Sequence, residues 1–255
     1  MPSPAAAAEP LNIAPANIRE RMIVALDVPS ADEARAIVAE LVDAVGAFKI
    51  GMQLFTAAGP DLVRELTGSG IRVFLDLKYH DIPNTVAAAG LEATKMGVWM
   101  FNVHASGGRE MMRRTYDVVG EYCELIRAKR PLIIGVTVLT SSDDQTLVET
   151  GVPATVNDHV SRLASLAFQA GLDGVVASPK EVAVVRRAVS KPRFLTVTPG
   201  IRGRDATSDD QRRVTTIGEA LAGGSDYVVI GRPILSAPDR RAAVEKLVQE
   251  AGQHE

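Results

Sequence analysis

The sequence predicts one α/β domain folded as a (β/α)₈ (TIM) barrel, and three observations support this prediction. Short apolar runs rich in β-branched residues alternate with segments of helical periodicity, which is typical of a parallel sheet covered by helices. Eight such units fill about 230 residues, which fits a (β/α)₈ barrel. The chain has 255 residues and no internal linker or shift in composition, and α/β barrels often use this length as a single domain.

The eight apolar runs are the predicted strands. They cover residues 22–28, 47–51, 72–77, 99–103, 132–138, 174–177, 194–198 and 227–230. Between them lie helix start signals: the segments S-A-D-E at 30–33 and S-P-K-E at 178–181 each have the form of a capping box. Gly46, Gly97 and Gly171 lie where helices are expected to end. A doubly wound open sheet is the competing fold, but no G-x-G-x-x-G follows the first strand.

The segment at 74–85, F-L-D-L-K-Y-H-D-I-P-N-T, carries the strongest functional signal. Alternate side chains of a strand share a face, so Asp76 and Lys78 are predicted to point the same way, and Asp81 follows past the end of the strand. Buried charges are costly unless they are paired. Two carboxylates and an ammonium beside an apolar strand therefore predict a functional site, with a salt-bridged loop as the alternative.

Other polar residues also fall at the ends of predicted strands, where barrel enzymes place their chemistry. They are Asp27, Lys49, Asn102, His104, Thr137, Thr140 and Ser141. The seventh strand leads into P-G-I-R-G at 199–203, and the eighth ends in Gly231 and Arg232. Phosphate groups usually bind at the loops after strands seven and eight. Gly231 and Arg232 are therefore predicted to hold a phosphate, and an exposed arginine after a surface turn is the plainer alternative.

Composition narrows the class of partner. The net charge is −3, from 28 basic and 31 acidic residues, without a long basic run, so we expect a small-molecule partner rather than nucleic acid or a membrane surface. No apolar run approaches the roughly 18 residues of a membrane span. Cys123 is the only cysteine, as expected in a reducing, cytoplasmic compartment. Residues 1–20 are predicted to be a flexible leader rather than a signal segment, and residues 21–255 the catalytic barrel.

The segment D-L-K-Y-H-D-I-P-N-T at 76–85 resembles the signature of the orotidine 5'-phosphate decarboxylase family. The similarity continues in A-L-D at 25–27, F-K-I-G at 48–51, V-T-V-L-T-S at 136–141, T-P-G-I-R at 198–202 and I-G-R-P at 230–233. It spans residues 21–247, and the leader is the visible departure. The resemblance implies a homodimeric barrel that converts orotidine 5'-phosphate to uridine 5'-phosphate and CO₂, the last step of de novo pyrimidine biosynthesis, with no metal or organic cofactor.

The resemblance also implies catalytic roles for four residues. Lys78 would donate a proton to C6 of the pyrimidine. Lys49, Asp76, Lys78 and Asp81 would form an array of alternating charge, and Asp81 would reach in from the other subunit. His80 and His104 are expected to be structural, because the family does not use them for chemistry.

The remaining implied roles concern substrate binding. Asp27 and Thr85 would contact the ribose hydroxyls, with Thr85 contributed by the other subunit; a turn carboxylate and a helix N-cap are the structural alternatives. Ser141 and the Thr140 backbone would read the pyrimidine edge. The phosphate side would include Arg202 beside the ligand, Gln211 bridging phosphate and base, and Gly231 with Arg232.

Two alternatives stay open at this point. A magnesium-dependent sugar-phosphate decarboxylase of the 3-keto-gulonate 6-phosphate type shares the barrel and the D-x-K-x-x-D signature. Such an enzyme carries a glutamate on strand two, where this chain has Lys49. A non-catalytic phosphate-binding barrel is the alternative from another class, and it would not need Asp76, Lys78 and Asp81 together.

Overall fold

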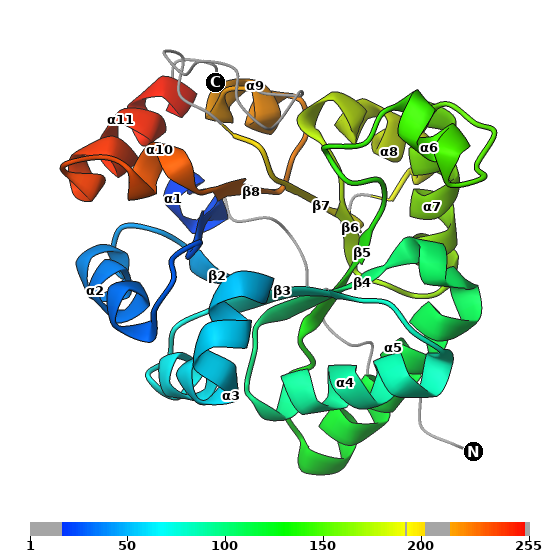
Figure 1. The fold of residues 1–255 in the computed structure, drawn as a ribbon, viewed down its shortest axis with the longest axis horizontal. Helices are drawn as coiled ribbons and strands as arrows, with labels where there is room; N and C mark the ends of the chain where they lie inside the picture. The colour runs from blue at the N-terminus through cyan, green and yellow to red at the C-terminus, as the bar shows by residue number, and fades with distance from the viewer. Residues whose placement is uncertain (1–16, 192, 202–214, 253–255) are drawn as a thin grey trace, which may run out of the picture.

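The computed structural model describes residues 17–191, 193–201 and 215–252. Eight parallel strands form a closed barrel in chain order, and the last strand pairs with the first. The strands are β1 (Met22–Ala25), β2 (Ala47–Gly51), β3 (Val73–Tyr79), β4 (Met100–His104), β5 (Leu132–Val136), β6 (Gly174–Val176), β7 (Leu195–Thr198) and β8 (Tyr227–Ile230). The predicted (β/α)₈ barrel is confirmed (Figure 1).

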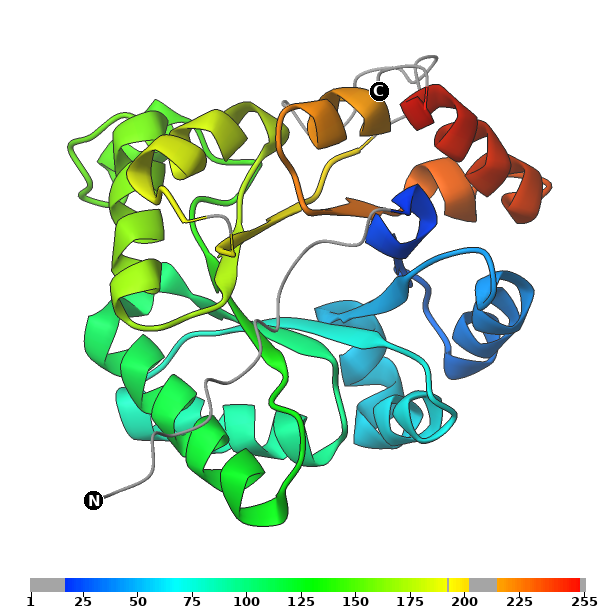
Figure 2. The ribbon, with the colours of Figure 1, turned by 180° about the vertical axis from the view of Figure 1, so that it is seen from behind.

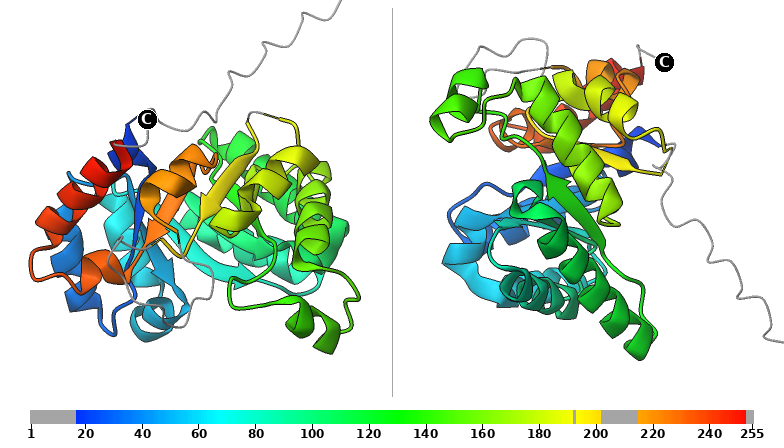
Figure 3. Two further views of the ribbon diagram at one scale, coloured as in Figure 1. Left: turned by 90° about the horizontal axis from the view of Figure 1, so that it is seen from above. Right: turned by 90° about the vertical axis from the view of Figure 1, so that its right-hand side faces the viewer.

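Helices surround the barrel, as the side views in Figure 3 show. They are α1 (Ile18–Arg21), α2 (Ala31–Leu41), α3 (Met52–Gly68), α4 (Pro83–Lys95), α5 (Gly108–Ile126), α6 (Asp144–Glu149), α7 (Val156–Gln169), α8 (Val182–Ala188), α9 (Ile217–Ala222), α10 (Arg232–Leu235) and α11 (Arg240–Gly252), with 3₁₀ turns η1 (Ala105–Gly107) and η2 (Pro179–Glu181). None of these helices is long and apolar enough to cross a membrane.

Side chains from the strands and from the residues just before them fill the barrel at the end where the strands begin. Trp99 and Tyr227 meet edge to face with ring centroids 5.2 Å apart, and the Arg72 guanidinium lies 5.3 Å from the Trp99 ring centroid. Above them, Phe74 and Met100 are buried among other inward-facing apolar side chains. A second, larger core lies between the barrel and its helices. Because one end is filled with rings, a ligand pocket is left to the other end, where the strands finish.

Two kinds of local sequence signal, helix-terminal glycines and a capping motif, have the predicted structure. Gly97 follows α4 with φ 77° and Gly171 follows α7 with φ 90°, which are left-handed conformations that glycine adopts readily at the end of a helix. The Ser178 N–H donates to the Glu181 carboxylate at 3.0 Å. This bond holds the turn that leads into α8, as expected for a capping motif.

Two local predictions need correction. The Ser30 hydroxyl oxygen accepts from the Glu33 N–H at 3.3 Å, but the Glu33 carboxylate meets the same hydroxyl instead of the Ser30 backbone, so only half of the predicted capping box forms. Gly46 is not a left-handed helix cap. A Cβ there would lie 2.1 Å from the Glu20 carbonyl oxygen, so glycine is needed because two backbone segments approach closely.

The described chain begins with a short helix, α1, that Asn17 caps by accepting from the Arg19 N–H at 2.9 Å. Arg19 forms an ion pair with Glu245 of α11, and Figure 2 shows α1 beside α11. Residues 17–20, which the predicted leader included, therefore contact the barrel helices. The rest of the predicted leader, residues 1–16, lies outside the described residues.

Candidate functional site

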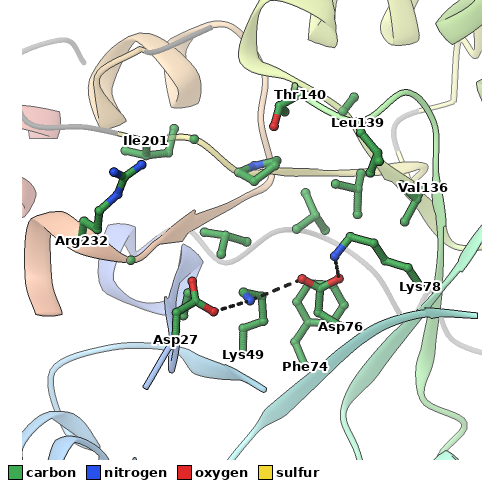
Figure 4. A pocket seen from close by; sticks show the side chains of 18 of the residues that line it. Asp27, Lys49, Phe74, Asp76, Lys78, Val136, Leu139, Thr140, Ile201 and Arg232 are labelled. Carbon is green, nitrogen blue, oxygen red and sulfur yellow. Dashed lines mark hydrogen bonds and ion pairs between the residues drawn. The ribbon is translucent and has the colours of Figure 1, made fainter. Parts of the chain in front are cut away.

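A pocket of about 290 Å³ opens where the strands end (Figure 4). One side carries charge, with Asp27, Lys49, Asp76 and Lys78 from the first three strands and the loops after them. The opposite wall is apolar and is contributed by β5, β6, β7 and the segments that follow them. It comprises Val136, Val138, Leu139, Val176, Ala177, Val197, Pro199 and Ile201. The pocket thus suits a ligand with an apolar face and a charged edge.

The charged side chains form a chain of alternating sign. The Lys49 ammonium lies 3.1 Å from Asp27 Oδ1 and 3.4 Å from Asp76 Oδ2. The Lys78 ammonium donates to Asp76 Oδ1 at 2.7 Å. Figure 4 shows these four side chains in sequence along one edge of the pocket. Three members of the predicted array, Lys49, Asp76 and Lys78, are therefore adjacent, and Asp27 extends the chain of charges in place of the fourth predicted member, Asp81.

Burial and charge act in opposite directions on Asp76, whose side chain is 13% exposed. Burial alone would raise the pKa of this carboxyl, because a low dielectric penalises the charged form. The ammonium groups of Lys49 and Lys78 and the hydrogen bonds from Lys78 and Asn102 outweigh burial, so the pKa of Asp76 lies below its ordinary value. Asp76 is therefore a fixed negative charge at neutral pH.

Strand β3 departs from regular geometry where its charged residues lie. Leu75 pairs with Phe101 of β4, but the next pair joins Tyr79 to Val103, so more residues of β3 than of β4 lie between the two pairs. Lys78 has φ 51°, a left-handed conformation that is uncommon for residues other than glycine. Asp76 and Lys78 do share a side, as predicted, but simple alternation is not the reason. The bulge re-aims Lys78 into the pocket.

Asn102 of β4, predicted only to lie at the end of a strand, is part of the site. Its side chain is fully buried. Its amide nitrogen donates to Asp76 Oδ1 at 2.7 Å, and its amide oxygen accepts from the Lys78 backbone N–H at 2.8 Å. The available signal was a polar side chain two residues after the inward-facing Met100, which places it inside the barrel.

Some of the residues predicted to bind phosphate lie within the described part of the chain. Gly231 and Arg232 line the pocket after β8, together with Gly200 and Ile201 after β7. Figure 4 shows Arg232 across the pocket from Lys78. Arg202 and Gln211, also predicted for this side, lie outside the described residues.

The predicted contacts to the pyrimidine edge lie on the segment after β5. Thr140 lines the pocket, and so does its neighbour Leu139. Ser141 is exposed in the following turn and is not among the lining residues.

Asp81 and Thr85 do not line the pocket of their own chain. Both are exposed, and Asp81 Oδ1 accepts the Ile82 N–H at 2.6 Å. The N-cap of α4 is Ile82, followed by Pro83, so Thr85 lies inside the first turn and the helix N-cap alternative for Thr85 is wrong. Ile82 itself is 67% exposed, which is unusual for a large apolar side chain beside a charged loop.

His80 and His104 lie together beside the pocket without lining it. Their ring centroids are 5.3 Å apart. Burial lowers the pKa of His104, and the neighbouring His80 and Lys78 lower it further. We expect His104 to be a neutral imidazole at neutral pH, which is compatible with the predicted structural role. Among the described residues, no group of three or more His, Cys, Asp or Glu side chains is arranged to hold a metal ion.

Residues 20–247 match the family model described as "Orotidine 5'-phosphate decarboxylase / HUMPS family". The chain belongs to this family. A protein from Syntrophotalea carbinolica named orotidine 5'-phosphate decarboxylase is 52% identical over 232 residues, covering 91% of this chain and 95% of the relative. One of the same name from Geobacter sulfurreducens is 50% identical, covering 91% and 96%.

Solved structures agree with the assignment to this family. The crystal structure of orotidine 5'-phosphate decarboxylase from Lactobacillus acidophilus has a TM-score of 0.77 at 36% identity, covering 90% of this chain and 98% of that one. An uncharacterized conserved protein from Geobacillus kaustophilus has a TM-score of 0.78, also at 36% identity, with coverage of 90% and 99%. The family description names two groups, so the choice between their activities for this chain depends on the residues at the pocket.

Proposed function

We propose that this protein decarboxylates orotidine 5'-phosphate to uridine 5'-phosphate and CO₂, the last step of de novo pyrimidine biosynthesis. The observation that carries the proposal is the chain of alternating charge from Asp27 through Lys49 and Asp76 to Lys78 at the pocket, in a chain about half identical to relatives of that name. Purified protein should lower the ultraviolet absorbance that distinguishes orotidine 5'-phosphate from its product, and should yield uridine 5'-phosphate. Binding of the nucleotide without turnover would favour a non-catalytic barrel instead.

The reaction explains why an ammonium is needed at this place. Loss of CO₂ from C6 of the pyrimidine leaves an electron pair on a vinyl carbon, where no carbonyl or imine is positioned to delocalise it. Preorganised charge must then stabilise the carbanion, and a proton must be at hand to quench it. Lys78 would do both: its ammonium favours the developing negative charge, then transfers a proton to C6 and takes one back from solvent.

Asp76 would act on the ground state. Its fixed charge would lie near the substrate carboxylate, and two like charges about 4 Å apart repel by about 4 kcal/mol at an effective dielectric of about 20. Enzymes lower barriers by about 8 to 23 kcal/mol, so relief of this repulsion supplies only a part. The remainder would come from Lys78 and from binding energy at the distant phosphate, which holds C6 against the charged side chains.

Substrate binding would use the two sides of the pocket differently. Asp27 would accept a hydrogen bond from a ribose hydroxyl, and the segment at Thr140 and Ser141 would contact the pyrimidine edge. Gly231 and Arg232 would hold the phosphate, with Arg202 and Gln211 completing that side. This arrangement is supported by the positions of Arg232 and Lys78 across the pocket from each other in Figure 4.

Replacement of Arg232 by alanine is expected to weaken the affinity for uridine 5'-phosphate and to raise KM by roughly 10- to 100-fold, the worth of a charge-assisted hydrogen bond to phosphate. Added guanidinium cation should restore part of the activity, because the lost group acts as a charge and a donor rather than as an acid or base. Titration of the product and steady-state kinetics measure both effects. Arg187→Ala, an exposed arginine on α8, is the matched control. Unchanged affinity in Arg232→Ala would place the phosphate elsewhere.

The protein would function as a homodimer in which Asp81 and Thr85 enter the site of the partner subunit. Both residues are exposed and lie outside the pocket of their own chain, and the exposed Ile82 between them would gain a buried environment at such an interface. We also propose a cytoplasmic location, in keeping with a nucleotide substrate and a single, buried cysteine.

A magnesium-dependent sugar-phosphate decarboxylase is the second candidate, and Lys49 argues against it. This ammonium lies between Asp27 and Asp76, so a cation already occupies the place between the carboxylates where a divalent ion would need acidic ligands. Decarboxylation is therefore expected to keep its full rate after exhaustive dialysis against EDTA. Activity that disappears with EDTA and returns with magnesium would instead support the sugar-phosphate activity.

A further inference from the structure

The bulge in β3 aims Lys78 at the pocket, but it also leaves that segment without its regular partner on β4. Between the pairs Leu75–Phe101 and Tyr79–Val103 the ladder is interrupted, and Lys78 keeps φ 51°. A non-glycine residue in this conformation persists only where its surroundings hold it. The backbone N–H of Lys78 therefore needs a partner from outside the strand pairing.

Asn102 supplies that partner. Its side chain lies on β4 at the level of the bulge, inside the barrel and fully buried. The amide oxygen accepts from the Lys78 N–H at 2.8 Å, while the amide nitrogen donates to Asp76 Oδ1 at 2.7 Å. The two bonds fix the orientation of the amide, because a flipped amide would set NH₂ against N–H and oxygen against carboxylate.

We propose that Asn102 is a positioning residue for decarboxylation, which sets the Lys78 turn and the Asp76 carboxylate in one geometry. Asn102 does not line the pocket, so it would act through these two residues and not by touching substrate. An amide side chain can accept from the Lys78 N–H and donate to the Asp76 carboxylate at the same time. Leucine has the same size but neither group, and an ionised aspartate has only acceptors. The proposal rests on the proposed roles of Asp76 and Lys78.

The first test separates positioning from binding. In Asn102→Leu, kcat is expected to fall about 100-fold, the typical effect of moving a catalytic group by about 1 Å. The affinity for uridine 5'-phosphate should change only a few-fold, because the phosphate grip lies across the pocket. Thr115→Val on α5 is the matched control: Thr115 is equally buried and its hydroxyl bonds only to the Met111 carbonyl. It should lose thermal stability but keep kcat.

The second test uses pH, which a purely structural role would not reproduce. In Asn102→Asp two carboxylates face each other, and their repulsion raises the pKa of the pair. Once the pair holds one proton, the new side chain can again donate to Asp76 and accept from the Lys78 N–H. The ratio of kcat for Asn102→Asp to kcat for the unmutated protein should therefore rise as pH falls from about 8 to about 5. The same ratio for Asn102→Leu should stay flat.

Folding is followed by circular dichroism at each pH. A folded Asn102→Leu with unchanged kcat would overturn the positioning role, and so would a flat ratio for folded Asn102→Asp. If Asn102→Leu does not fold, the Asn102→Asp profile alone decides. Lys78→Ala is measured in the same assay: normal turnover by that variant would overturn the proposed function of Lys78, whereas its inactivity beside an unaffected Asn102→Leu would overturn only the inference about Asn102.

Discussion

Lys78→Ala is expected to lower kcat by at least about 10⁴-fold, because one substitution removes both a positioned proton donor and the charge that stabilises the carbanion. The Lys78 ammonium lies at the pocket and donates to Asp76 at 2.7 Å, so no neighbouring group replaces it in kind. Lys49 is held by Asp27 and Asp76 instead. Steady-state kinetics on orotidine 5'-phosphate, with circular dichroism to verify folding, make the measurement.

Lys246→Ala provides the control for loss of a lysine charge. This residue lies on α11 with its side chain 62% exposed, and its replacement should leave kcat unchanged. A folded Lys78→Ala variant with near-normal kcat would show that the proton reaches C6 from another group.

Asp81→Ala is expected to lower kcat by about 10²-fold or more, the scale of removing one preorganised charged group from a site. Within one chain Asp81 is exposed and lies outside the pocket, so it has no contact there that would explain such a loss. The effect requires that Asp81 complete the charge array in the partner subunit. Asp61→Ala on α3, where the carboxylate is 92% exposed and pairs with Arg64, is the matched control and should keep full activity.

Mixing the two strongly impaired variants tests this arrangement. When Lys78→Ala and Asp81→Ala are unfolded and refolded together, random pairing makes about half of the dimers mixed. In a mixed dimer of twofold symmetry one site carries both lesions and the other carries neither, so about a quarter of all sites should be intact. Activity should reappear at about that fraction. If Asp81 acted within its own chain, every site would keep one lesion and mixing would recover nothing.

Much of the fold could be predicted because each strand and helix carries its own signal. The predicted strand 47–51 coincides with β2, and the predicted strand 227–230 with β8. The first and fifth strands end earlier than predicted, at Ala25 and Val136. Their apolar runs continue into loops that bury side chains such as Leu26 and Val138, and hydrophobicity alone does not separate a buried loop from a strand.

The site was predictable where it depends on chain order and not where it depends on pairing between strands. Asp76, Lys78 and Lys49 could be placed together because the carboxyl ends of neighbouring parallel strands meet at one end of a barrel. The bulge at Lys78 depends on how β3 pairs with β4, and no local sequence pattern in β3 indicates that pairing. Asn102 went without a role for the same reason, since its importance comes from two bonds to another strand.

Turnover of orotidine 5'-phosphate in D₂O tests most directly whether decarboxylation passes through a C6 carbanion that Lys78 protonates. If decarboxylation leaves a carbanion at C6 that the Lys78 ammonium quenches, the exchangeable protons of that ammonium are deuterons in this solvent. We expect uridine 5'-phosphate with a single deuterium at C6 and none at C5, as read by proton NMR and mass spectrometry. Deuterium at C5 would indicate protonation of the ring elsewhere, and intact orotidine 5'-phosphate after incubation with folded protein would contradict the proposed activity itself.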